Sequence, residues 1–169
     1  VVNVGNIDAP HMLLYHFNFG YPLIDKGTEL LWEGDWSARE KGENNKIFKE
    51  GNSFKICQSP LAAHNGAGEE AAFIDIAHDT DYVCSCGIQN KNLGIALALT
   101  FDKRQLPWLT NWQHWGVGEY VTGLEPGTNP PIGQRKVRET NDLIILKPYE
   151  RKKYELRIDL SNSIEKITK

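Results

Sequence analysis

The chain has 169 residues, 40% of them hydrophobic, and 19 Lys and Arg against 22 Asp and Glu, which gives a formal net charge of −3. This length can form one domain with a sizeable core, and the near balance of charge gives no electrostatic reason to expect a nucleic-acid or anionic-membrane partner. No apolar run approaches the length of a membrane span, and the opening residues lack the charged and apolar regions of a signal peptide. We therefore expect a cytoplasmic protein that binds neither nucleic acid nor membrane.

The first predicted element covers residues 11–19, "HMLLYHFNF", and ends before the turn residues Gly20 and Pro22. In a strand, residues two apart point the same way, so His16 and Asn18 share one face and three aromatic residues share the other. The aromatic face indicates packing. The polar face is either solvated or the floor of a polar site.

Further strands are predicted at residues 28–33 and, beyond a long polar stretch, throughout the second half of the chain. Residues 34–52 show no period and are expected to form an ordered loop that could hold a short helix. The later strands are expected at residues 71–78, 81–90, 92–102, 107–116, 119–127, 142–148 and 152–160. Their spacing, with turn residues between them, predicts an all-β fold, a single antiparallel β-sandwich domain spanning residues 1–169.

The cysteines Cys57, Cys84 and Cys86 are too few and too unevenly placed for a disulfide framework. Cys84 and Cys86 share a strand face, which is poor geometry for a bridge between them. With His78 as a fourth ligand they would still form too loose a cluster for zinc. The sequence predicts reduced, structural thiols and no metal.

Glu125 and His16 are the strongest candidates for proton transfer. Glu125 ends an apolar strand just before Pro126-Gly127, where a carboxylate can reach a cleft, and partial desolvation would raise its pKa into the range of a general base. His16 is a candidate acid because the unperturbed pKa of imidazole lies near neutrality. The alternatives stay open: a glutamate at the rim of the sheet, and a core histidine bonded to backbone.

Four other residues could bind a substrate. In "NWQHW", Trp112 offers a flat face that stacks on sugar rings and Gln113 an amide that binds hydroxyls, although a core tryptophan is the alternative. Asp75 and His78 lie on opposite faces of a regular strand, so only one can face a site unless a bulge intervenes. Phosphate loops, nucleophile elbows, HExxH and paired CxxC motifs are absent from the sequence.

Four segments in order resemble the aldose 1-epimerase or galactose mutarotase-like family: "VVNVG", "LLYHFNFGYPLIDKG", "LALTFDKRQLPWLTNWQHWGVGEYVTGLEPG" and "LIILKPYERKKYELRI". The resemblance implies a supersandwich that interconverts the α and β anomers of an aldose without a cofactor. It implies that His16, in "YHFNFG", is the catalytic acid and that Glu125, in "LEPG", is the catalytic base. Substrate binding then falls to Asn18, Asp75, His78, Trp112 and Gln113.

Members of this family are nearly twice as long and take a substrate-binding Arg and a second His from their N-terminal half. The resemblance therefore implies that this chain is the C-terminal part of a longer domain, poorly active by itself, whose exposed sheet edges recruit either its own N-terminal half or another copy. The expected small-molecule partner is a sugar. One alternative is a non-catalytic carbohydrate-binding β-sandwich, and another is a sandwich domain of a polysaccharide lyase or larger glycosidase.

Overall fold

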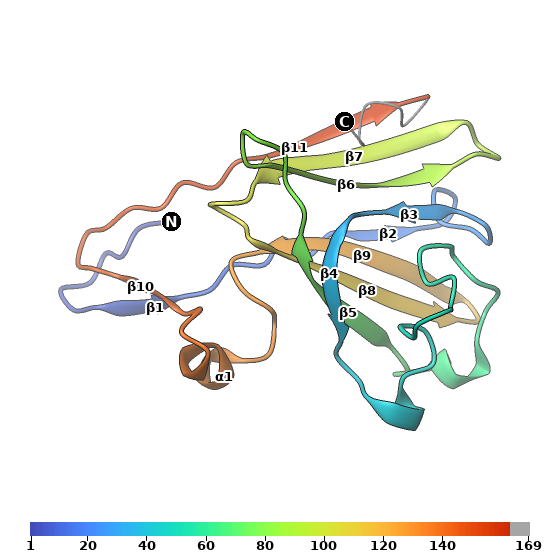
Figure 1. Cartoon of the computed structure of the whole chain (residues 1–169), viewed down its shortest axis with the longest axis horizontal. Helices are drawn as coiled ribbons and strands as arrows, with labels where there is room; N and C mark the ends of the chain where they lie inside the picture. The colour runs from blue at the N-terminus through green and yellow to red at the C-terminus, as the bar shows by residue number, and fades with distance from the viewer. Residues whose placement is uncertain (163–169) are drawn as a thin grey trace.

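The protein is a sandwich of two antiparallel sheets, seen in a computed structural model that describes residues 1–162 (Figure 1). The five-stranded cavity sheet has the order β2 (Asn18–Gly20), β9 (Glu119–Gly127), β8 (Trp108–Gly116), β5 (Glu70–Ile76) and β4 (Gly34–Ala38). The four-stranded back sheet has the order β11 (Leu156–Ser161), β7 (Ile95–Asp102), β6 (Val83–Asn90) and β3 (Glu29–Leu31). The all-β, antiparallel sandwich expected from the sequence is confirmed.

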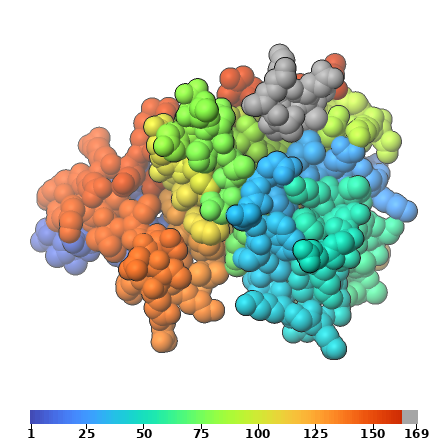
Figure 2. Space-filling view, viewed as in Figure 1, coloured from blue at the N-terminus to red at the C-terminus, as the bar shows by residue number. Residues whose placement is uncertain are grey.

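A smaller lobe lies at one side of the sandwich (Figure 2). It contains the two-stranded sheet of β1 (Ala9–His11) and β10 (Ile144–Leu146) and the helix α1 (Gln134–Glu139). Two short 3-10 turns, Gly42–Asn44 and Ala62–His64, complete the described elements. None of the helices described has the length and apolar composition that crossing a bilayer requires.

The core lies between the two sheets and is built from alternate residues of the long strands. Cross-strand partners place Asn111 opposite Leu124 and Leu109 opposite Pro126, so one side of β8 and β9 points inward. The residues of that core that are completely buried include Ile74, Ile88, Leu99, Leu109, Trp115 and Leu124. The other side of the cavity sheet is left to carry polar groups.

Two local expectations were wrong. The predicted strand over residues 11–19 is broken between β1 and β2, where the Phe17 N–H donates to the Tyr15 carbonyl at 3.0 Å and His16 sits at the centre of a tight turn. The polar stretch 34–52 contains β4, which pairs with β5 alone among the described strands and has no completely buried residue, so it lacks the apolar run that marks the longer strands.

The three cysteines are free and buried. Burial raises the pKa of Cys57 to about 12 and that of Cys84 to about 11, so both stay protonated thiols near neutral pH. Within residues 1–162, no cluster of three or more His, Cys, Asp or Glu side chains is arranged to hold a metal ion.

Candidate functional site

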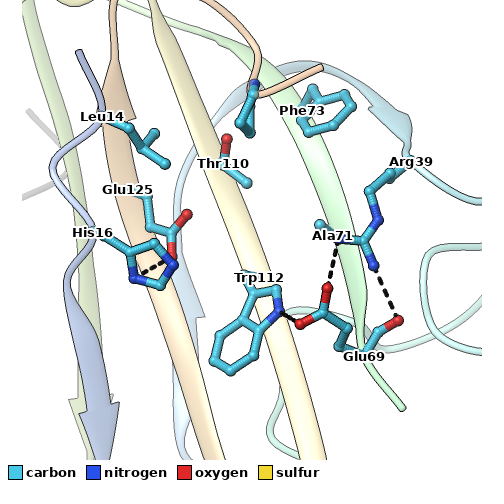
Figure 3. Close-up of a pocket in the computed structure, with 10 residues that line it drawn as sticks. Leu14, His16, Arg39, Glu69, Ala71, Phe73, Thr110, Trp112 and Glu125 are labelled. Carbon is cyan, nitrogen blue, oxygen red and sulfur yellow. Dashed lines mark hydrogen bonds and ion pairs between the residues drawn. The ribbon is translucent and has the colours of Figure 1, made fainter. Parts of the chain in front are cut away.

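A cavity of about 250 Å³ opens on the outer face of the cavity sheet (Figure 3). Strand pairing explains its lining, because Phe73 lies opposite Thr110 and Thr110 opposite Glu125, which sets all three side chains on one face. The full lining is Leu14, His16, Arg39, Glu69, Ala71, Phe73, Thr110, Trp112, Glu125 and Pro131. These residues come from β5, β8, β9 and the connections beside the strands of this sheet.

Glu125 is buried within this cavity, with 2% of its surface exposed. Its carboxylate lies across Gly123, where an added Cβ would come within 2.5 Å of Oε1, so the absence of a side chain at Gly123 makes the position possible. Burial first, and then the negative charge of Glu69, raises the pKa of Glu125 to about 7. Oε1 is buried and makes no hydrogen bond to the described residues.

His16 faces Glu125 from the tight turn before β2. Two backbone contacts hold this turn beside the end of β9. The Tyr15 N–H donates to the Pro126 carbonyl at 2.9 Å, and Leu14 forms an isolated antiparallel β-bridge with Gly127. His16 Nδ1 then lies 3.2 Å from Glu125 Oε1, within ion-pair distance but without hydrogen-bond geometry. Just over half of the His16 side chain, 56%, stays exposed. One proton-transfer group is therefore buried and its neighbour is open to solvent and ligand.

Trp112 forms the floor of the cavity beside this pair, with its ring centroid 6.2 Å from that of His16. Its Nε1–H donates to Glu69 Oε2 at 2.6 Å, and Glu69 Oε1 accepts from Arg39 Nη1 at 2.8 Å (Figure 3). Burial alone would raise the pKa of Glu69, but the hydrogen bonds from Arg39 and Trp112 outweigh it and lower that pKa. Glu69 is thus an ionised carboxylate that orients the indole.

The structure brings together three of the residues singled out in the sequence, Glu125, His16 and Trp112, in one cavity. Asn18 pairs with Gly123 and lies on the same face of the sheet, but it is exposed and does not line the cavity. Gln113 is completely buried on the opposite face, where its amide donates to Asn111 and accepts from Trp115. Its hydrogen bonds are therefore made inside the core.

Asp75 and His78 also lie away from the cavity. Asp75 is exposed farther along β5 and pairs with Lys103. His78 follows the strand, with Nδ1 2.7 Å from the Asp79 carbonyl. Both line a separate shallow hollow that also contains Gly34.

Arg39 and Glu69 were missed by sequence reasoning, although both line the cavity. Arg39 follows β4 in the stretch that carries no period, and its N–H donates to the Ala71 carbonyl. Glu69 offered a weak signal, since it stands two residues before Ala71 and so shares the face of Ala71 and Phe73 if the strand is extended backwards.

Comparison with known proteins gives one family and one solved structure. The family model described as "Domain of unknown function (DUF4432)" matches residues 1–160. No curated protein matches the chain. The crystal structure of a "putative aldose 1-epimerase" from Klebsiella pneumoniae subsp. pneumoniae MGH 78578 is similar with a TM-score of 0.82 and 24% identity, over 94% of this chain and 40% of that one. At this identity the similarity shows a shared, mutarotase-like fold, and the present chain spans 40% of the Klebsiella chain.

Proposed function

The chain belongs to the DUF4432 family, and we propose that its cavity interconverts the α and β anomers of an aldose, with Glu125 as the base and His16 as the acid. The base takes the proton of the C1 hydroxyl while the acid protonates the ring oxygen. The C1–O5 bond breaks, the open-chain aldehyde rotates about C1–C2, and closure on the other face returns both protons. Every proton that leaves one group is received by another.

The observation that carries this proposal is that Glu125 is buried in the cavity and has a raised pKa. A buried carboxylate oxygen without a hydrogen-bond partner is costly, and carboxylates with strongly perturbed pKa values are concentrated at functional sites. With a pKa near 7, Glu125 can both accept and return a proton close to neutral pH. His16, 3.2 Å away and half exposed, is placed to exchange a proton with a ligand that contacts both side chains.

The rest of the cavity suits a single sugar ring. Its volume, about 250 Å³, lies below the roughly 300–1,000 Å³ of pockets for drug-sized ligands. Trp112 supplies a flat apolar face, and Glu69 and Arg39 supply an acceptor and donors for hydroxyl groups. The fold shared with the Klebsiella protein, described as a "putative aldose 1-epimerase", supports the same reaction class.

A polarimetric experiment tests the proposal. Freshly dissolved α-D-glucose and α-D-galactose should relax to their equilibrium rotation faster as the protein concentration increases. Tryptophan fluorescence, titrated with the same sugars, measures binding to the Trp112 floor independently. Binding without any acceleration would instead favour the non-catalytic carbohydrate-binding domain.

The pH dependence of the reaction follows from Glu125. The ionised form is the base, so the rising limb of the pH–rate profile should have its midpoint at about pH 7. Glu69→Gln removes a negative charge that raises the Glu125 pKa, so this rise should move to lower pH. Glu40→Gln is the matched control, because Glu40 also binds Arg39 but does not act on Glu125. An unmoved midpoint in Glu69→Gln, from rates measured between about pH 5 and 9, would contradict the assignment.

Replacing Trp112 by alanine should weaken sugar binding by about three- to tenfold, because an aromatic contact contributes roughly 0.5–1.5 kcal/mol. Trp112→Phe keeps a ring but loses the N–H that binds Glu69 Oε2, so its affinity should fall between the two. Isothermal titration calorimetry at high sugar concentration gives both values. Equal affinities for wild type and Trp112→Ala would remove Trp112 from the binding surface.

A further inference from the structure

Glu69, the carboxylate that orients Trp112, lies just outside the strand whose face it extends. β5 begins at Glu70, and its register with β8 places Glu69 one residue farther, opposite His114. The strand pairing therefore stops short of Glu69 and does not fix it. Its carboxylate is nonetheless held in one direction, between the Trp112 indole and the Arg39 guanidinium (Figure 3).

His114 holds the peptide directly before Glu69. His114 Nδ1 lies 2.5 Å from the Gly68 carbonyl oxygen, and because a carbonyl oxygen can only accept, Nδ1 carries the hydrogen of this bond. The imidazole is buried, and it stacks on Trp112 with 6.0 Å between ring centroids and 10° between ring planes. His114 thus contacts both the backbone that carries Glu69 and the ring that Glu69 orients.

Packing alone does not account for a histidine at this position. His114 Nε2 is buried and makes no hydrogen bond to the described residues, although Glu119 Oε2 lies 3.4 Å away. An unpaired buried nitrogen is costly, and an aliphatic side chain of similar size would avoid that cost. The hydrogen bond from Nδ1 to Gly68 is the interaction that an aliphatic side chain could not make.

Gly68 also lies close against the 3-10 turn Ala62–His64. A Cβ added at Gly68 would come within 2.1 Å of the Ala63 carbonyl oxygen, so the two backbone segments can approach this closely only because Gly68 has no side chain. The turn and His114 together restrict the peptide that precedes Glu69.

We propose that His114 is a positioning residue of the cavity, which holds the Gly68 peptide so that the Glu69 carboxylate points at the indole N–H. The ring of Trp112 then stays in place as the floor on which a sugar stacks. His114 is not one of the residues that line the cavity, so it acts on a ligand only through these neighbours. The inference rests on the proposed function, because it assigns Glu69 and Trp112 to sugar binding.

The indole N–H resonance of Trp112, recorded without sugar by ¹H–¹⁵N NMR and assigned with Trp112→Phe, tests the proposal. A short hydrogen bond to a carboxylate deshields the proton, so this resonance should lie downfield. His114→Asn and His114→Leu both lack the imidazole ring, but only asparagine keeps an N–H donor near the position of Nδ1. The resonance should stay downfield in His114→Asn and move upfield in His114→Leu. His114→Phe keeps a ring without the donor and should also move the resonance upfield.

Sugar affinity gives a second measurement. His114→Leu should weaken binding of D-galactose roughly three- to tenfold, the contribution of one hydrogen bond, and His114→Asn should weaken it less than about twofold. At about pH 8.5, where Glu125 is ionised, the loss should appear in KM, and kcat should change less than about twofold, because Glu125 and His16 are untouched.

His11→Leu is the matched control, because His11 is a buried histidine whose Nε2 lies 2.8 Å from the Tyr154 hydroxyl, in β1 and outside the cavity lining. It should leave the Trp112 resonance and the sugar affinity unchanged, even if it lowers the free energy of unfolding. A folded His114→Leu or His114→Phe variant with the wild-type resonance overturns the inference. So does a His114→Asn resonance that moves as far upfield as that of His114→Leu.

The spectra also separate this inference from the proposed function. They are recorded without sugar, so they decide whether His114 positions Glu69 whatever the protein does to a sugar. A wild-type protein that leaves the rate of anomer interconversion unchanged would contradict the proposed function alone.

Discussion

Glu125→Gln is expected to lower the rate of anomer interconversion by about 10² to 10⁴, the range for loss of general acid–base assistance. Glutamine keeps the shape of the side chain above Gly123 but cannot accept the C1 hydroxyl proton. Initial polarimetric rates at saturating sugar give the ratio. Sugar binding, followed by tryptophan fluorescence, should change little, because the Trp112 floor is intact.

The same substitution should lower the rate but increase the stability of the fold. Measuring the free energy of unfolding therefore also shows whether the variant is folded. The pKa of Glu125 is raised from 4.5 to about 7 on folding, so the folded protein binds the proton more tightly than the unfolded chain. The stability from this group is fully present below pH 4.5 and is lost as the pH rises through about 7. Glu125→Gln should therefore exceed wild type in free energy of unfolding above about pH 7. A variant that is less stable than wild type at about pH 8 would mean that the carboxylate is not buried as described.

Trp115→Ala is expected to destabilise the fold by about 3–5 kcal/mol, the cost of removing a buried tryptophan. Trp115 is completely buried, its ring centroid lies 4.6 Å from that of Tyr120, and its indole N–H donates to Gln113 Oε1 at 3.1 Å. Truncation would leave a cavity and also an unsatisfied Gln113 carbonyl. Urea denaturation of wild type and variant at neutral pH measures the difference.

Trp112→Ala is the matched comparison for this prediction. Trp112 and Trp115 stand on the same strand, but Trp112 points to the cavity and its side chain is only partly buried. Truncating Trp112 should cost much less stability while weakening sugar binding, and Trp115→Ala should show the reverse. A loss of less than about 1 kcal/mol in Trp115→Ala would show that this tryptophan contributes little to the core, contrary to its burial.

The long strands could be predicted because burial imposes a pattern on them. β5 to β9 are buried at most of their seven to nine positions, so the sequence shows them as long segments rich in apolar residues between turn residues. β4 was harder to recognise, because this five-residue edge strand has no completely buried residue and the alternation in "GDWSA" is too short to stand out beside the polar residues that follow it. The six residues of α1 are too few to establish a helical period.

The candidate site was predictable only in part, for a related reason. Glu125 and His16 stood out because a carboxylate and an imidazole interrupt otherwise apolar segments. Arg39 and Glu69 lie in polar segments, where a charged residue is unremarkable until pairing of β4 with β5 brings them side by side. In the sequence Asp75 also interrupts an apolar strand, as Glu125 does. In the structure it lies beyond Phe73 along β5, and its carboxylate pairs with Lys103.

The central claim is that the buried carboxylate of Glu125 and its neighbour His16 move the protons of an anomeric centre. Magnetisation-exchange NMR on D-galactose measures the exchange rate between the α and β C1–H signals at equilibrium, with wild type, with Glu125→Gln and without protein. We predict an exchange rate that increases in proportion to wild-type concentration and returns to the protein-free value, within about one per cent of the wild-type increment, with Glu125→Gln. Equal exchange rates for wild type and a folded, sugar-binding Glu125→Gln variant would contradict it.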